Sequence, residues 1–374
     1  MYNVLTIGGA TQDLFIQCPS LDYTAISHTH SITTYLMLEA DAKIEVDKLI
    51  SFSGGGSTNT AVSFRRLGCS VATYCAIGND QAGTIVLNDL INNGINTKLI
   101  HTSSHESTGI SFIIDTDQGQ RSILAYRGAN SHLSLDYLSA EAIAGHQQLY
   151  ITSLSNESAA LLPTIASIAH QYRIPLALNP GKSQLSQGLP GIRQALPHVN
   201  TLILNSLEAK TLMMALAGSD NSYKEKLHES TGKPLGTLND ESIDPYLLHV
   251  GIACEKVCFN LQLFFRTVLS MGPTIVVVTN GKNGVYVATQ KTIYFHPSIK
   301  TTVINTVGAG DAFGSCFVGS LLMGDTIKDA MRNGIINSAS VLSYKGAKDG
   351  LLTMQELQTR RKALPEHLLV SFPL

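Results

Sequence analysis

Short apolar runs recur along the chain, and most of them are continuous rather than interrupted by polar residues. Such runs predict strands that are buried on both faces, as in a parallel sheet. The predicted buried strands are 3–8, 71–77, 148–152, 175–178, 201–204 and 274–279. Apolar residues recur at helical spacing in 57–67, 80–92, 158–171, 206–216, 310–323 and 326–342. This alternation predicts an α/β fold, with a doubly wound, mostly parallel sheet flanked by helices and a ligand cleft at the carboxyl ends of the strands.

A second set of segments has the pattern of strands with one exposed face. These segments are 12–17, 31–38, 43–53, 107–115 and 120–126. The last two flank Asp117-Gln118-Gly119, which is a typical turn sequence. We therefore expect a small antiparallel β sheet in addition to the main sheet.

Residues 217–272 interrupt the alternation of strands and helices. The part from Gly218 to Asp244 is rich in polar and turn residues, which predicts a loop. The part from Pro245 to Met271 carries apolar residues at helical spacing: Leu247, Val250, Ala253, Cys254, Val257, Leu261 and Phe264. We interpret it as one helix packed on the core, with a partner-binding surface as the alternative.

The composition is that of a soluble intracellular enzyme. The chain has 374 residues and a net charge of −2, which give no electrostatic reason to expect nucleic acid or an anionic membrane as a partner. No apolar segment is long enough to span a bilayer, and the N-terminus begins with a predicted strand rather than a signal sequence. We therefore expect a cytoplasmic protein.

The six cysteines are scattered and include no CxxC pair. This spacing favours reduced thiols among apolar neighbours. Cys254 and Cys258 could share a helix face, but without nearby histidines or further cysteines a zinc site is the weaker interpretation.

The run Asn305-Thr306-Val307-Gly308-Ala309-Gly310-Asp311-Ala312-Phe313 precedes a strongly apolar helical pattern. The glycines predict a turn that opens a buried helix and leaves backbone N–H groups free to bind a phosphate. Asp311 follows the glycines directly and could take a proton from a hydroxyl that attacks this phosphate. A plain helix cap is the alternative for the same residues.

A second glycine run covers residues 53 to 61 and reads Ser-Gly-Gly-Gly-Ser-Thr-Asn-Thr-Ala. Successive glycines let the backbone approach a small ligand closely. Asn59 offers both a donor and an acceptor to the hydroxyls of such a ligand.

Together the two runs resemble signatures of the ribokinase-like (PfkB) family of carbohydrate and nucleoside kinases. The first run matches the family's GG-x-x-x-N substrate segment, and the second matches its D-T-x-G-A-G-D anion-hole segment. Further matches follow in the family's order: Ile7-Gly8-Gly9 with Asp13, Asn205 with Glu208, Thr279 to Gly284, and Asn337-Ser338-Ala339-Ser340. The resemblance implies a single kinase domain over 1–374, with lid strands within about 12–53 and 107–126 and a family-atypical insertion at about 217–272.

The resemblance also implies an activity, the transfer of the γ-phosphoryl group of MgATP to a hydroxyl of a sugar or related polyol. Asp311 is the implied base, and the turn of Gly308, Ala309 and Gly310 is implied to hold the transferring phosphoryl group. The implied acceptor-binding residues are Asp13, Gly55, Gly56 and Asn59. The implied ATP-binding residues are Asn205, Thr279, Gly281, Gly284, Asn333 and Asn337. Glu208 is implied to position Mg²⁺ through water, although Asn205 and Glu208 could also be an N-cap and its capping-box partner.

Two departures from the family pattern limit what the resemblance implies. Asn305 stands where the family usually has an aspartate beside a monovalent cation, which puts K⁺ activation in doubt. Gly56 replaces the lysine of ribokinases proper, and residues 150–155 contain no glutamate, so ribose is not the favoured acceptor.

Three classes of function stay open from the sequence. A sugar kinase is the leading hypothesis, and a nucleoside kinase or a catalytically impaired sugar-binding regulatory homologue are the alternatives. A nucleoside site would need aromatic or apolar side chains in the lid. Tyr35, Met37 and Leu38 could supply them, or could instead pack within the lid or form a homodimer contact.

Overall fold

A nine-stranded sheet forms the centre of the protein in this computed structural model, which describes residues 3–18, 21–28, 31–115, 121–187, 189–219, 245–254 and 257–374. The strand order is β19-β18-β17-β16-β13-β12-β11-β1-β6. Strands β6, β1, β11, β12, β13 and β16 run parallel, and β17, β18 and β19 add an antiparallel edge. The bounds are β1 Asn3–Ile7, β6 Ser70–Tyr74, β11 Gln148–Ile151, β12 Leu176–Leu178, β13 Thr201–Asn205, β16 Ile275–Thr279, β17 Val285–Ala288, β18 Thr292–His296 and β19 Val370–Pro373.

The parallel part of the sheet confirms the prediction from the continuous apolar runs. Only the expected strand over 71–77 is divided, because β7 (Ala76–Gly78) leaves the main sheet and pairs with β8 (His101–Ser103). Leu5 and Ile7 of β1 belong to one apolar core cluster, whereas Val4 of the same strand belongs to another. Both faces of the sheet are therefore buried, which explains why its strands read as unbroken apolar runs.

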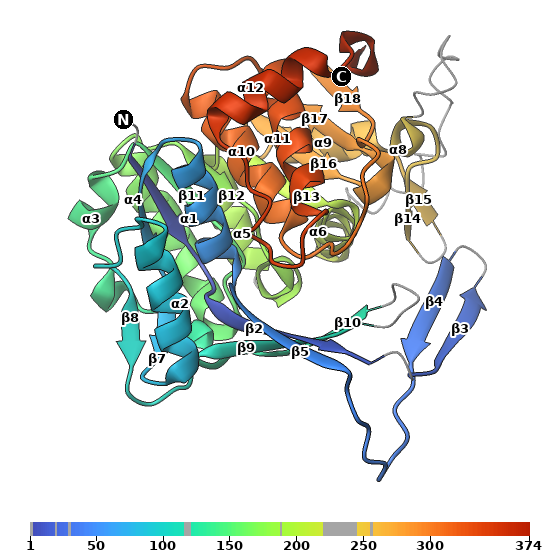
Figure 1. Cartoon of the computed structure of the whole chain (residues 1–374). Helices are drawn as coiled ribbons and strands as arrows, with labels where there is room; N and C mark the ends of the chain where they lie inside the picture. Colours follow the sequence, from blue (N-terminus) through green and yellow to red (C-terminus); the bar gives the residue numbers. More distant parts are fainter. Residues whose placement is uncertain are drawn as a thin grey trace.

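Helices cover the two faces of the sheet (Figure 1). The cluster around Val4 includes residues of α1, α2, α10 and α11, and the cluster around Leu5 includes residues of α4, α5, α6 and α9. Their bounds are α1 Gly56–Arg66, α2 Gln81–Asn92, α4 Leu162–Gln171, α5 Leu189–Ala195, α6 Ser206–Ser219, α9 Leu261–Leu269, α10 Ala309–Leu322 and α11 Ile327–Val341. Two further helices outside the insertion are α3 (Ala140–Ala144) and α12 (Met354–Ala363). Six of these helices match the predicted ones within a few residues.

A separate four-stranded sheet projects from the main body (Figure 1). It contains segments that the sequence led us to expect as lid strands, and we call it the lid sheet, or lid, after that expectation. Its strand order is β10-β9-β2-β5, with bounds Arg121–Tyr126, Gly109–Asp115, Thr11–Gln17 and Lys48–Gly54. The expectation of a purely antiparallel sheet is wrong in one respect, because β2 and β9 pair in parallel. The expected strand over 31–38 does not join this sheet. It is β4 (Ser31–Leu36), which pairs with the unpredicted β3 (Tyr23–His28) in a hairpin.

The single helix expected over Pro245–Met271 is not observed. The chain instead forms α8 (Tyr246–His249), the hairpin strands β14 (Ile252–Cys254) and β15 (Val257–Phe259), and α9. Gly251 breaks the helical pattern with a φ of +83°, a left-handed conformation that favours glycine. Asn260 then starts α9 as its N-cap, since its side-chain oxygen accepts a hydrogen bond of 2.7 Å from the Gln262 N–H.

The hairpin also changes the interpretation of Cys254 and Cys258, which lie on neighbouring strands rather than on one helix face. Within the described ranges, no group of three or more His, Cys, Asp and Glu residues could hold a metal ion. In the same ranges, no helix combines the length and the apolar character needed to cross a bilayer. The polar segment expected as a loop, 218–244, lies outside the described residues from position 220 onward.

Candidate active site

The turn before α10 has the conformation that the glycine run predicts. Gly308 is the N-cap of α10 with a φ of +80° and has no side chain to cap the helix, so the first N–H groups stay available for a ligand. The side chain of Asn305 holds the turn: its oxygen accepts a hydrogen bond of 3.1 Å from the Val307 N–H, and its amide donates to the Lys345 carbonyl. The sequence thus predicted the turn, and the structure adds how it is fixed. Anion binding by this turn stays a prediction, and we call it the anion-binding turn after that prediction.

Asp311 joins this turn to the other glycine run. The amide of Asn59 on α1 donates a hydrogen bond of 2.8 Å to Oδ2 of Asp311, across 252 positions of sequence. The oxygen of the same Asn59 amide is buried and has no hydrogen-bond partner within the described chain. A buried acceptor of this kind suits a ligand hydroxyl, since an unpaired polar atom is costly to bury.

Burial sets the acidity of Asp311. Desolvation raises the pKa of this carboxyl from 3.8 to about 6, the Asn59 hydrogen bond opposes the rise, and the charge of Asp13 adds to it. The helix dipole, which favours the ionised form, therefore acts against a larger effect of burial. A carboxylate with a pKa near 6 is still mostly ionised at neutral pH and is a stronger base than an exposed aspartate.

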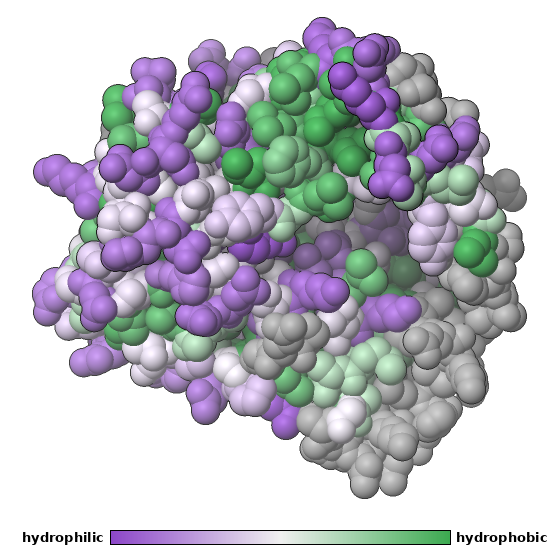
Figure 2. Space-filling view, turned by 90° about the horizontal axis from the view of Figure 1, so that it is seen from below, coloured by the Kyte–Doolittle hydropathy of each residue, from purple (hydrophilic) through white to green (hydrophobic). Residues whose placement is uncertain are grey.

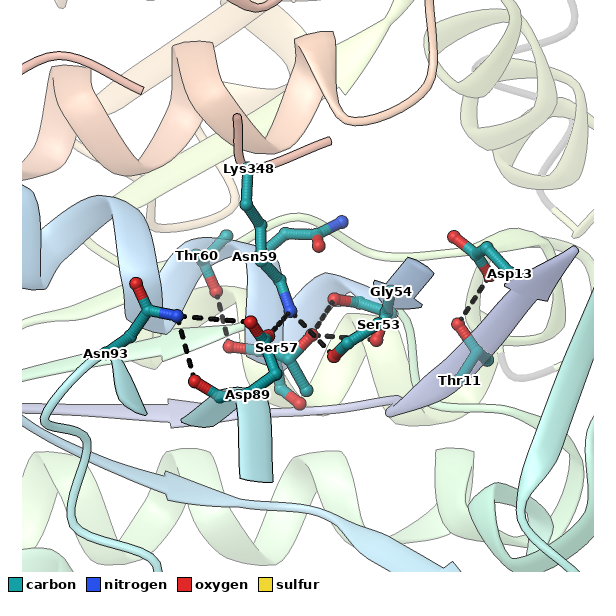
Figure 3. Close-up of polar contacts among 12 residues, drawn as sticks. Thr11, Asp13, Ser53, Gly54, Ser57, Asn59, Thr60, Asp89, Asn93 and Lys348 are labelled. Carbon is teal, nitrogen blue, oxygen red and sulfur yellow. Dashed lines mark hydrogen bonds and ion pairs between the residues drawn. The ribbon is translucent and has the colours of Figure 1, made fainter. Parts of the chain in front are cut away.

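The glycine run over residues 53–61, which we call the acceptor segment after its predicted role, lies against Asp13 of β2 (Figure 3). A Cβ on Gly54 would lie only 2.0 Å from Oδ2 of Asp13, and a Cβ on Gly56 would lie 2.8 Å from the Thr152 side chain. Gly55 has a φ of +96°, and a Cβ there would lie 2.4 Å from the Gly9 carbonyl. All three glycines are therefore required by close packing.

Asp13 is itself buried, which raises the pKa of its carboxyl, and it accepts a hydrogen bond of 2.8 Å from the Thr11 hydroxyl. With Asn59, it offers polar atoms beside the glycine backbone, and acceptor binding by these two residues stays a prediction.

Asn205 and Glu208 form a capping box at the start of α6. The Glu208 carboxylate accepts a hydrogen bond of 2.8 Å from the Asn205 N–H, and the Asn205 side chain accepts one of 2.8 Å from the Glu208 N–H. Both residues also line a cavity of about 170 Å³ together with Asp311. Burial raises the pKa of Glu208, and the nearby Asp311 carboxylate raises it further. The two interpretations of this pair are therefore compatible.

A larger cleft also borders the turn before α10. The molecular surface seen from below is hollowed near its centre (Figure 2). A cavity of about 830 Å³ is lined by Gly281 and Ala309, and an adjoining one of about 150 Å³ is lined by Thr279 and Gly310. Gly284 shapes the turn behind them with a φ of +103°. These cavities are large enough for a nucleotide whose phosphates reach the turn.

Asn333 and Asn337 lie apart from this lining. Both are fully buried in α11: Asn333 donates to the Ser320 hydroxyl at 2.9 Å, and Asn337 donates to the Ala312 carbonyl at 3.0 Å. The neighbouring Ser338 and Ala339 face the cleft instead. Helical periodicity explains the difference, because a residue one position along the helix points about 100° away.

Two residues at the site escaped the sequence reasoning. Tyr246, the first residue of α8, is 44% exposed and lines the 830 Å³ cavity. Lys348 follows α11, and its Nζ lies 2.6 Å from the Asp89 carboxylate and 2.9 Å from the Ser53 hydroxyl (Figure 3). Tyr246 directly precedes the apolar stripe that starts at Leu247, which is a local signal for the first residue, whereas no local pattern marks the second.

The chain is similar to known proteins over most of its length. The profile of the pfkB family of carbohydrate kinases matches residues 18–235 and 264–354. The ribokinase of Haemophilus influenzae is 26% identical over 304 residues, which are 81% of this chain and 85% of that protein. The 2-dehydro-3-deoxygluconokinase of Bacillus subtilis is 24% identical over 348 residues, 89% of this chain and 94% of that protein.

Solved structures agree with this fold. Arabidopsis thaliana ribokinase, complexed with ribose and ATP, has a TM-score of 0.72 at 17% identity, with 97% of this chain and 99% of that chain covered. The Methanocaldococcus jannaschii nucleoside kinase has a TM-score of 0.67 at 17% identity, again with 97% and 99% covered.

Proposed function

The chain belongs to the pfkB family of carbohydrate kinases, and from this premise we propose that it transfers the γ-phosphoryl group of ATP to a hydroxyl of a neutral sugar or polyol, with Asp311 as the base. The Asn59–Asp311 hydrogen bond is the observation that carries the proposal. In this hydrogen bond Asp311 of one motif contacts Asn59 of the other, which supports a joint role of the two as base and acceptor-binding amide. An acceptor hydroxyl bound to Asn59 would therefore lie beside both the base and the open N–H groups of α10.

The residues divide the chemistry between them. The N–H groups of the turn around Gly308, Ala309 and Gly310 would stabilise the charge on the transferring phosphoryl group. Asp311 would take the hydroxyl proton late in the transfer, when the bond to the leaving oxygen is largely broken. Glu208 fits a Mg²⁺ site held through water. Its carboxylate and that of Asp311 line one cavity and repel each other, which raises the pKa of Glu208, and a cation between them would relieve this repulsion. When bound, Mg²⁺ neutralises charge on the phosphates.

The charges at the acceptor site favour a neutral acceptor. Two carboxylates face this region, the buried Asp13 and the half-buried Asp311. Lys348 is the cation that interacts with both, but its ammonium group is already paired with Asp89 at 2.6 Å. An acceptor with its own phosphate would meet these two carboxylates and a cation that is already paired with Asp89, whereas hydroxyl groups can donate hydrogen bonds to both carboxylates.

A nucleoside acceptor is the second candidate, because one aromatic pair favours it. Phe15 and Phe52 meet edge to face with ring centroids 5.5 Å apart. Both lie on the lid face that carries Asp13, since Phe52 pairs directly with Asp13 and Phe15 is two residues further along β2. A base could stack there. Tyr35, Met37 and Leu38, which the sequence offered for this role, are exposed on and after β4.

A panel of acceptors would decide between these candidates. We would incubate the purified protein with MgATP and pentoses, hexoses, sugar acids, a sugar phosphate or nucleosides, and measure ADP formation and the phosphorylated product. The proposal expects turnover with a neutral sugar, and a rise in melting temperature with the same sugar, since a ligand stabilises the state it binds. Turnover confined to nucleosides would favour the second candidate, and turnover confined to a sugar phosphate would contradict the charge argument.

We also propose that K⁺ has little effect on this enzyme. The amide of Asn305 donates to the Lys345 carbonyl, a contact that a carboxylate could not make. The turn is thus held by a hydrogen bond where a cation would otherwise have to join two oxygen atoms.

Finally, we propose a homodimer formed through the lid. Leu49, Phe112, Leu124 and Tyr126 share the lid face opposite Asp13, and each is at least 36% exposed. We call these four residues the outer lid face. A second copy of the chain would cover this apolar surface.

A further inference from the structure

The loop after α11 reaches across the active site through Lys348. The Lys348 side chain is only 10% exposed, and its Nζ contacts both the Asp89 carboxylate of α2 and the Ser53 hydroxyl of β5 (Figure 3). Ser53 directly precedes Gly54, whose backbone lies against Asp13. Asp89 is oriented in turn by Asn93, which donates to its other oxygen at 3.1 Å. Lys348 therefore ties its loop to the acceptor segment.

The same loop contacts the anion-binding turn through its other residues. A Cβ on Gly308 would lie 2.4 Å from Cβ of Ala347, so these two residues are packed as closely as their atoms allow. The carbonyl of Lys345 accepts the hydrogen bond from Asn305. The segment Lys345–Lys348 is thus a bridge, with the anion-binding turn at one end and the acceptor segment at the other.

The charge of Lys348 acts on both carboxylates of the site. It lowers the pKa of Asp13 and of Asp311, against the desolvation that raises both. The other titratable groups that interact with Asp311 are Glu208 of α6 and Tyr150 of β11. Because its ammonium group is hydrogen-bonded to the Asp89 carboxylate, Lys348 is a cation held in one position.

We propose that Lys348 is a positioning residue for phosphoryl transfer, which holds the acceptor segment and the anion-binding turn in one arrangement through the bridge Lys345–Lys348. The inference rests on the proposed function. A buried ion pair has a defined geometry but contributes little net stability, so its value here is in fixing two parts of a site relative to each other. Displacing a reacting group by about 1 Å can cost roughly 100-fold in rate.

The test is Lys348→Met, which removes the charge but keeps the length of the side chain. Asp89 is 31% exposed and can be hydrated after the change. We expect kcat to fall at least tenfold and the acceptor KM to rise, while a fluorescent ADP analogue binds with unchanged affinity. We also expect the acid limb of the kcat profile to move to higher pH, because removing a nearby cation raises the pKa of Asp311.

Arg361→Met is the matched control. Arg361 is 20% exposed and pairs with Asp325 at 3.4 Å, away from the acceptor segment. Both variants should lose some melting temperature, but only Lys348→Met should lose kcat and shift the pH profile. Suppose that the two variants lose the same amount of melting temperature, and that both keep the wild-type kcat and the wild-type acid limb of the pH profile. Lys348 then has a purely structural role, and the inference is overturned.

Two further results would decide the remaining cases. If Lys348→Met does not fold, Lys348→Arg is measured instead: the inference expects a folded enzyme with a reduced kcat, and wild-type kinetics would overturn it. Wild-type turnover tests the proposed function itself. An inactive wild type would overturn both ideas, whereas an active wild type with unaffected Lys348 variants would overturn only this one.

Discussion

At the scale of single residues, the ionised form of Asp311 is needed for catalysis but lowers the stability of the folded protein. Its raised pKa of about 6 means that the folded protein binds a proton there more tightly than the unfolded chain does. The ionised carboxylate therefore costs stability, and this cost grows as the pH rises from the unfolded value of 3.8 and is complete above pH 6. Activity needs that same ionised form.

We predict that Asp311→Asn lowers kcat by roughly 10²–10⁴-fold, the usual contribution of a general base. The variant should also melt a few degrees higher at pH 8, with the difference shrinking as the pH falls towards 4. Wild-type kcat should decline below about pH 6, where Asp311 becomes protonated. The measurements are initial rates and thermal melts across this pH range. A variant with near wild-type kcat would remove Asp311 from the chemistry, and a lower melting temperature at pH 8 would favour a capping role.

Asn305 allows a second prediction at this scale. In Asn305→Asp, a carboxylate would face the Lys345 carbonyl in place of the donating amide. Two oxygen atoms repel each other unless a cation lies between them, so the variant should need K⁺ for full activity and lose several-fold in kcat without it. The natural protein should respond weakly. The measurement is a KCl titration of the initial rate at constant ionic strength, and strong K⁺ activation that is equal in both proteins would contradict the prediction.

At the scale of elements, the sequence predicted well wherever one local rule determined the outcome. The strands of the parallel sheet, such as 201–204, are apolar on both faces, and the turn at Gly308 is marked by its glycines. The helix expected over Pro245–Met271 failed because apolar spacing cannot reveal a break. Gly251 and Asn260 make that break. Because a single residue of this kind is also tolerated inside a helical pattern, neither of them marks a helix end by itself.

The ATP-site residues show a related limit. Motif resemblance indicated Asn333 and Asn337, yet these two residues of α11 are buried against α10. Their neighbours Ser338 and Ala339 line the cleft instead. Which side of a helix faces a ligand depends on tertiary packing that a short motif does not contain. The partner of Lys348, more than two hundred positions away in sequence, could not be inferred for the same reason.

The short helix α8 brings an aromatic side chain to the cavity of about 830 Å³, where we expect the nucleotide to bind. Tyr246 is 44% exposed there, and Leu247 beside it is buried and donates its N–H to the Tyr286 hydroxyl at 3.0 Å, which anchors the helix. We predict that Tyr246→Ala raises the KM for MgATP about fivefold or more, because a stacked or packed aromatic contact is lost. The acceptor KM should not change, and Tyr246→Phe should restore the wild-type value.

Tyr344→Ala is the matched control for this prediction, since Tyr344 is 47% exposed but lines a different cavity beside α12. Equal effects of both alanine variants on the KM for MgATP would show that Tyr246 has no particular place in nucleotide binding.

At the scale of the whole molecule, the site exists only because distant parts of the chain meet. The lid supplies Asp13, α1 supplies Asn59, and α10 supplies Asp311. The lid sheet itself has one face turned to this site through Asp13 and Phe52, and the other is the outer lid face. An exposed apolar face of this kind is typical of a surface that a protein partner covers.

We predict that the outer lid face is covered by a second copy of the chain. Sedimentation velocity of the wild-type protein at micromolar concentration should show a dimer, and Leu49→Asp or Leu124→Asp should give a monomer, because each places a charge in the apolar contact. Tyr172→Asp is the control, as Tyr172 is 43% exposed at the end of α4, outside the lid. A dimer that persists in both leucine variants would place the contact elsewhere. A monomeric wild type with full activity would show that the lid works without a partner.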